Sequence, residues 1–165
     1  MYHFLTVEDV VADQEMLLAT YGGGFTGILN QGQLESAVYQ PQAGFCTAYF
    51  RSDAYEMASA YLEHLLLAHA FCNGNKRIAL SSALRFLCVN GVRIRATSAE
   101  LVDLVLGVIA HRVTDEQITQ FFRDHAQEIL DFQLAQDDAS RATALQQASE
   151  WVNSTCASAM RKLAE

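Results

Sequence analysis

No stretch of this chain reaches the ~18 consecutive apolar residues of a membrane span, and no basic start leads into a long apolar run. Basic residues are also few: 11 Lys and Arg stand against 19 Asp and Glu, which gives a formal net charge of -8. Nucleic acids are bound by basic stripes, so a nucleic-acid partner is not expected. These absences predict a cytoplasmic protein that contacts neither a membrane nor, directly, a nucleic acid.

Proline and cysteine are scarce too. The chain has one Pro and four Cys among 165 residues, and no two cysteines show Cys-x-x-Cys spacing. A structural zinc site is therefore not expected, and the cysteines are interpreted as reduced thiols in or near the core. Because 51% of the residues are apolar and only 18% are charged, a chain of this length can bury one core, which indicates a single compact unit.

The most informative feature that is present is the run of nine residues from His69 to Arg77, HAFCNGNKR. Apolar residues recur at helical spacing on both sides of this run, from Asp53 to His69 and again from Ile78 to the Asn90-Gly91 pair. The run is therefore predicted to form a loop between two buried helices. We call it the motif loop.

The residue types of the motif loop suit phosphoryl chemistry. The first free N–H groups of the second helix carry the positive end of its dipole, and Gly74 leaves room for close approach of an anion. Arg77 offers a planar fork, Lys76 a compact charge, and residues 73–75 a turn of successive N–H groups. An imidazole can take a proton from a hydroxyl at neutral pH, so His69 is the candidate base.

A structural interpretation competes with this one. His69 would then be a helix-end histidine bonded to a carbonyl, and Lys76 and Arg77 would form a solvated first turn. Helix starts favour acidic side chains, however, and two cations in the first turn oppose the helix dipole. A broken local rule of this kind is typical of functional sites, which favours the phosphate interpretation.

The motif loop resembles the signature loop of the Fic/Doc superfamily, and Lys76 resembles the variant found in its Doc, or death-on-curing, branch. The likeness continues through the Gly22-Gly23-Gly24 run, residues 33–37 and the Asn90-Gly91 pair, and covers roughly residues 4 to 128. The resemblance implies an all-α fold, a helical bundle with a small β-hairpin flap beside the active loop. It also implies transfer of part of a nucleotide to a protein hydroxyl.

The branch decides which group is moved. In the Fic branch a glycine stands at the position of Lys76 and an AMP group is transferred, whereas the Doc branch turns the nucleotide around. The resemblance therefore implies a toxin that transfers the γ-phosphate of ATP to a Ser or Thr hydroxyl of a protein, with elongation factor Tu as the family precedent, and so blocks translation. His69 would be the catalytic base, and Gly74, Asn75, Lys76 and Arg77 would bind ATP.

One departure from the family pattern concerns the metal. Asn73 stands where the family has an Asp or Glu that holds Mg²⁺ against the phosphates. A neutral amide oxygen is expected to bind this hard cation more weakly, so Asn73 is a weak candidate Mg²⁺ ligand. Ile78 and Ser81 also replace the usual Thr and Asn. Two alternatives therefore stay open: nucleotidyl transfer of the Fic type, and a binding module that has lost its chemistry.

The remaining helices are predicted from their start signals. They cover residues 6–21, 33–39, 99–110 and 115–130, and the last two begin with capping boxes. The helix over 99–110 is apolar nearly all round, which predicts a place in the middle of the bundle. Residues 22–31, rich in glycine, are predicted to form either a hairpin or an irregular loop.

Residues 1–130 are predicted as the Fic/Doc-like domain, and residues 131–165 as a C-terminal helical extension outside the resemblance. Within the extension, apolar residues from Leu145 to Leu163 recur at spacings of three or four, as in an amphipathic helix. That helix would pack back on the core or on a second copy, or else extend the surface for a substrate or partner.

A toxin of this kind needs restraint. No Glu is followed by Gly or Asn, so the inhibitory helix motif of many Fic relatives is absent from the sequence. The Doc resemblance implies an antitoxin protein whose disordered tail folds as a helix into a groove of the toxin. Two candidate grooves are the aromatic stretch of Phe45, Tyr49 and Phe50, and the apolar stripe from Leu145 to Leu163.

Overall fold

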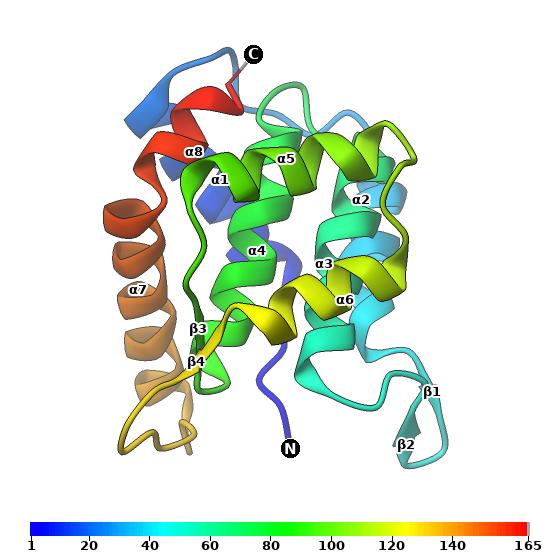
Figure 1. Cartoon of the computed structure of the whole chain (residues 1–165), viewed down its shortest axis with the longest axis vertical. Coiled ribbons are helices and arrows are strands. Elements are labelled where there is room, and N and C mark those ends of the chain that lie inside the picture. The colour runs from blue at the N-terminus through cyan, green and yellow to red at the C-terminus, as the bar shows by residue number, and fades with distance from the viewer. Residues whose placement is uncertain (165) are drawn as a thin grey trace.

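The computed structural model describes residues 1–164 as a helical bundle with two short β-ribbons (Figure 1). Its longer helices are α1 (Val7–Tyr21), α2 (Gln31–Tyr39), α3 (Ala54–Ala68), α4 (Asn75–Val89), α5 (Ser98–Ile109), α6 (Asp115–Asp124) and α7 (Asp138–Thr155). The short ones are η1 (Gln40–Gln42) and α8 (Ala157–Lys162), and the strands are β1 (Gly44–Phe45), β2 (Ala48–Tyr49), β3 (Val92–Ile94) and β4 (Ala126–Glu128). The predicted all-α bundle with a small hairpin is confirmed.

Helix α4 lies in the middle of the bundle, with α1, α3 and α7 packed around it (Figure 1). Thirteen of its fifteen residues are buried, against five of the twelve in α5. The prediction that residues 99–110 form the central helix was therefore wrong. The burial of α4 was not predicted because its buried face carries polar residues. Ser81 and Arg85 on this face both contact the carboxylate of Asp13 on α1.

The chain between α6 and α7 also differs from the prediction. The helix expected to run to Leu130 ends at Asp124, and β4 follows it. This strand pairs antiparallel with β3, so that Val92 lies opposite Glu128 and Ile94 opposite Ala126. Val92 and Ile94 of β3 are buried. If residues 126–128 were helical, they could not form hydrogen bonds with the backbone of β3.

The C-terminal segment packs back on the core, which confirms one of the predicted alternatives. Its apolar stripe is buried: Leu145, Ala148, Val152, Cys156, Ala159, Met160 and Leu163 all belong to the main hydrophobic cluster. The stripe is divided between two helices, because the chain leaves α7 at Cys156 and begins α8 at Ala157. Among the described residues, no helix is long and apolar enough to cross a bilayer.

The hairpin β1–β2 lies at the opposite end of α3 from the motif loop (Figure 1). Four residues separate its end at Tyr49 from Ala54, the first residue of α3, whereas His69 follows the last residue of this helix, about 22 Å further along its axis. The Phe4 ring anchors the hairpin there by contacting Tyr49 and Phe86. The small hairpin that the resemblance implies is present, but it lies at residues 44–49 rather than at residues 22–31, and it is not beside the motif loop.

Candidate functional site

The motif loop begins with a sharp change in backbone direction at His69. This residue caps α3 in the left-handed conformation, with φ 44° and ψ 43°, and its side chain is exposed. A non-glycine residue rarely adopts this conformation, which costs on the order of 1 kcal/mol and has to be stabilised by its surroundings. The next two residues provide that support, because Ala70 and Phe71 are buried in the core. The turn therefore exposes the imidazole to solvent, while the backbone next to it is held by the core.

The side chain of Asn75 closes the loop. Its Oδ1 accepts a hydrogen bond from the Phe71 N–H at 3.0 Å, and its Nδ2 donates to the Phe71 carbonyl at 2.9 Å. Both polar groups of one buried backbone position are thus satisfied by one amide, a two-point clasp across the loop. Asn75 was predicted to bind the nucleotide; its side chain holds the loop, and its backbone N–H lies in the first turn of α4.

The start of α4 has an N-cap residue without a side chain. Gly74 is its N-cap residue with φ 81°, and no side chain caps the helix. Gly74 therefore offers no side-chain acceptor to the backbone N–H groups at the positive end of the dipole. Lys76, the second residue of α4, is half-buried at this point. His69 and the helix start belong to one run of nine consecutive residues, of which the last three form the first turn of α4.

Two residues of helix α1 contact the motif loop. Gln14, which is buried, donates a hydrogen bond from Nε2 to the Asn73 carbonyl at 3.0 Å, and Leu18 packs against Gly74. Sequence reasoning did not identify Gln14. A signal was present, because a polar residue here falls on the same helical face as Val10 and Leu17, both of which are core residues.

The glycine-rich segment, residues 22–30, lies alongside the motif loop. Leu29 N–H donates to the Ala70 carbonyl at 2.7 Å, and Cys72 N–H donates to the Gly27 carbonyl at 2.9 Å. One antiparallel bridge, between Ile28 and Phe71, joins the two segments. Of the two predicted alternatives for this segment, the irregular loop is confirmed.

Gly24 approaches the side chain of Asn73 very closely. A Cβ added at position 24 would come within 1.6 Å of Asn73 Oδ1, and φ at Gly24 is +128°. Only glycine fits at this position. The glycine-rich segment therefore contacts the half-buried Asn73 side chain, which was predicted as a weak Mg²⁺ ligand.

The donors for a metal are correspondingly sparse. Within residues 1–164 no group of three His, Cys, Asp or Glu side chains is placed to hold a metal ion. Asn73 alone is not a Mg²⁺ site, since this cation is usually held by one or two carboxylates together with phosphate oxygens. The protein side of the site therefore fits a nucleotide phosphate better than it fits a free metal ion, and no chemical step is assigned to the metal.

Arg77 is placed differently from the other predicted nucleotide ligands. It is 1% exposed, and its guanidinium donates to the carbonyls of Tyr21, Gly22 and Met160. The predicted phosphate contact would require these bonds to be given up. Ile78 and Ser81, the two residues that replace the family's usual Thr and Asn, also lie in the core.

Ser81 belongs to a buried charged cluster with Asp13 and Arg85. Asp13 Oδ2 lies 3.2 Å from an Arg85 nitrogen and accepts a hydrogen bond from Ser81. Burial raises the pKa of Asp13, although the charge of Arg85 and the Ser81 hydrogen bond act in the opposite direction. The cluster fixes α1 against α4, and so fixes Gln14 beneath the motif loop.

Comparison with known proteins gives a consistent result. The sequence model of the Fic/DOC family matches residues 4–87. "Protein kinase doc" of Escherichia phage P1 is 32% identical over 120 residues, which cover 72% of this chain and 92% of that protein. "Toxin Doc" of Mycolicibacterium smegmatis (strain ATCC 700084 / mc(2)155) is 35% identical over 100 residues, which cover 58% of this chain and 71% of that protein.

Proposed function

This chain belongs to the Fic/DOC family, and we propose that it is a Doc-like toxin that transfers the γ-phosphate of ATP to a Ser or Thr hydroxyl of a target protein. The observation that carries the proposal is the presence, within nine consecutive residues, of an exposed imidazole and of a helix start whose N-cap residue is glycine. Its similarity to a protein named as a kinase and to one named as a toxin supports the choice of chemistry. Elongation factor Tu is the first target to test, and its modification would block translation.

In the proposed reaction, His69 is the catalytic base. It accepts the proton of the attacking hydroxyl, whose oxygen forms a bond to the γ-phosphorus while the bond from that phosphorus to the β-phosphate oxygen breaks and ADP leaves. ATP supplies the phosphoryl group. The left-handed turn at His69 keeps the imidazole outside the core, where a protein substrate has access to it.

The phosphates are proposed to bind at the start of α4. Gly74 and the backbone N–H groups of Asn75 and Lys76 provide donors, and the Lys76 ammonium adds a charge. In the family resemblance, a lysine here fills space that a glycine would leave for the inner phosphates, which favours the orientation with the γ-phosphate toward the hydroxyl. Positions 73 to 76 would thus orient ATP, with Asn73 a weak ligand of the accompanying Mg²⁺.

ATP labelled separately on the α and γ phosphates tests the proposal. We expect the γ label, and not the α label, to appear on the target protein. Label from the α position would assign nucleotidyl transfer instead, and label from neither position would assign a binding module. The Asn73→Asp variant is run in parallel, so that weak metal binding is separated from absence of the chemistry.

A partner protein that restrains the toxin is also proposed, and the structure separates the two candidate grooves. The stripe from Leu145 to Leu163 is buried inside the protein and is not available to a partner. Phe45 and Phe50 of the hairpin region are each 75% exposed, and Tyr49 is 45% exposed. These aromatic residues are the surface on which we place the antitoxin helix.

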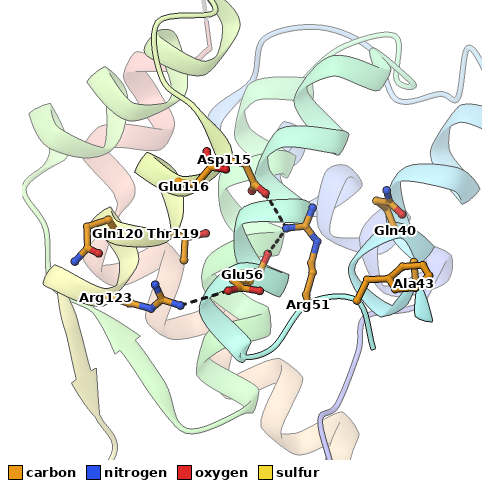
Figure 2. A pocket seen from close by; sticks show the side chains of 10 residues that line it. Gln40, Ala43, Arg51, Glu56, Asp115, Glu116, Thr119, Gln120 and Arg123 are labelled. Atoms are coloured by element: carbon orange, nitrogen blue, oxygen red, sulfur yellow. Dashed lines mark hydrogen bonds and ion pairs between the residues drawn. The ribbon is translucent and has the colours of Figure 1, made fainter. Parts of the chain in front are cut away.

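A polar pocket of about 520 Å³ borders the same surface (Figure 2). Arg51 lies inside it, with one guanidinium nitrogen 3.0 Å from Asp115 and 3.0 Å from the Glu56 carbonyl, and Arg123 faces Glu56 from α6. The charged groups already pair with one another, so the apolar rim at Phe50 offers the better contact for a helix.

Coexpression tests the partner. The Asn73→Asp form is expressed with and without the neighbouring gene, and Phe45→Asp and Phe50→Asp forms are compared with it. We expect the neighbouring gene product to restore growth and to copurify, and the two substitutions to weaken the complex. Equal growth in all cases, with no complex recovered, would contradict the antitoxin proposal.

A further inference from the structure

Arg77 bonds to the backbone of two segments that lie far apart in the sequence, the end of α1 and α8. Its Nε donates to the Met160 carbonyl of α8 at 2.7 Å, one terminal nitrogen donates to the Gly22 carbonyl, and the other donates to the Tyr21 carbonyl at 3.4 Å. The Tyr21 ring lies beneath the guanidinium, 5.5 Å from its centre. The side chain is 1% exposed, so solvent does not compete for any of these bonds.

These three acceptors are the C-terminal ends of two helices. Tyr21 ends α1, Gly22 is its C-cap residue, and Met160 lies in the last turn of α8. The last carbonyls of a helix have no intrahelical donor and carry the negative end of its dipole, so a cation there is stabilised. The last turn of α1 contains no basic residue of its own. Arg77 supplies that cation from outside.

This arrangement accounts for a cation in the first turn of α4. The dipole of α4 itself opposes a positive charge at this position, but the negative ends of α1 and α8 converge on the guanidinium and offset that cost. A lysine would keep the charge and lose the fork that reaches three carbonyls at once. The requirement at position 77 is thus for a donor fork as well as for a charge.

We infer that Arg77 is a positioning residue rather than a phosphate ligand, and that α8 is part of the structure that holds the motif loop in place. Gly22 begins the glycine-rich segment, which bonds to the loop at Ala70 and Cys72, and Arg77 is two residues from the Asn75 clasp. One guanidinium therefore fixes the start of α4 relative to both neighbours. The catalytic part of this inference rests on the proposed phosphotransfer.

The test compares Arg77→Lys with deletion of residues 157–165 and with the two changes combined. Arg161→Lys is the matched control, because the Arg161 guanidinium also lies over the Tyr21 ring, at 5.7 Å, but its side chain is exposed. For each form, amide hydrogen exchange of residues 69–78 is measured together with kcat and KM for ATP.

We expect Arg77→Lys and the deletion each to speed exchange across the loop and to lower kcat by about tenfold or more, since small misplacements of reacting groups cost this much. Because Arg77→Lys and the deletion act on the same contact, the kcat of the combined form should be no lower than that of the more impaired single form. Arg161→Lys should behave as the unmodified protein.

The opposite pattern would overturn the inference. A direct phosphate ligand predicts that Arg77→Lys raises KM for ATP with exchange in the loop unchanged, that the deletion leaves KM alone, and that the two effects add. If the deletion form does not fold, the exchange and KM of Arg77→Lys decide by themselves. If the unmodified protein transfers no phosphate, the proposed function fails, while exchange still reports whether Arg77 and α8 hold the loop.

Discussion

Replacement of Asn75 by alanine should separate the stability of the fold from the geometry of the motif loop. Asn75→Ala removes both hydrogen bonds to the backbone of Phe71, which is 2% exposed. Each such bond contributes about 0.5–1.5 kcal/mol net, so the free energy of unfolding should fall by about 1–3 kcal/mol. For a protein of this size that corresponds to a decrease in Tm of roughly 4–8 °C for a 2 kcal/mol loss.

The chain contains a matched control at the other end of the same helix. Asn90 is the C-cap residue of α4, and its side chain accepts from the His3 N–H at 2.9 Å and donates to the His3 carbonyl at 3.0 Å. It also donates to the Phe86 carbonyl. Asn90→Ala therefore removes the same kind of two-point clasp, together with this one further bond, and should cost at least as much stability.

The two variants should differ in catalysis. Without its clasp, the loop no longer fixes His69 relative to the start of α4, and a misplacement of about 1 Å can cost on the order of 10²-fold in rate. Thermal unfolding and phosphate transfer per folded molecule are measured for both. We expect Asn75→Ala to lose transfer and Asn90→Ala to keep it. Equal transfer by the two variants, at equal loss of stability, would refute the view that the clasp positions the catalytic residues.

Three other perturbations have defined outcomes. Asn73→Asp places a carboxylate at the proposed metal position and should lower the Mg²⁺ concentration needed for activity; identical Mg²⁺ titrations would show that position 73 is not a ligand. Burial raises the pKa of Asp9, but the hydrogen bond and charge of Arg141 and the Thr6 hydrogen bonds outweigh it and hold the pKa below its ordinary value. The resulting stability is present at pH values above that ordinary pKa and is lost as pH falls through the lowered pKa. Asp9→Asn should therefore lower the free energy of unfolding by about 1 kcal/mol at pH 7 and weaken its dependence on pH in acid. An unchanged pH dependence in acid would contradict this. Burial raises the pKa of Cys156 to about 11, whereas Cys72 is exposed, so a thiol reagent at pH 8 should modify Cys72 first, and equal rates would show that α7 and α8 open readily.

Features encoded in short stretches of sequence were predicted well. The motif loop was found because His69 to Arg77 carries its signature in nine consecutive residues and is bounded by two helices with clear apolar periodicity. Thr97 and Thr114 start helices through capping boxes, which are signals of four residues. Each of these predictions depended only on local physics.

Features that depend on distant contacts were predicted poorly. Burial of α4 was missed because the partner of its Ser81 and Arg85 is Asp13, which lies 68 residues before Ser81 and still further before Arg85. Likewise, β4 forms by pairing with β3, and the prediction from the local sequence wrongly extended α6 through its residues. The acceptors of Arg77 lie on α1 and α8, so sequence showed the anomalous cation but not the helix ends that stabilise it.

The cysteine prediction was half right for a similar reason. Cys88 and Cys156 are buried thiols, as predicted, but Cys46 and Cys72 are exposed. Both exposed residues lie in turns between elements, where apolar neighbours in the sequence do not indicate burial.

The central claim is most directly tested by the intact mass of a target protein, with elongation factor Tu as the first candidate, after incubation with ATP and either the unmodified chain or His69→Ala. His111→Ala is the matched control, because His111 is also exposed and has φ 54°, close to the 44° of His69. The account predicts a mass increase of one phosphoryl group on a Ser or Thr with the unmodified chain and with His111→Ala, and a rate at least 10²-fold lower with His69→Ala. An increase of one AMP group, or full phosphorylation by His69→Ala, would contradict it.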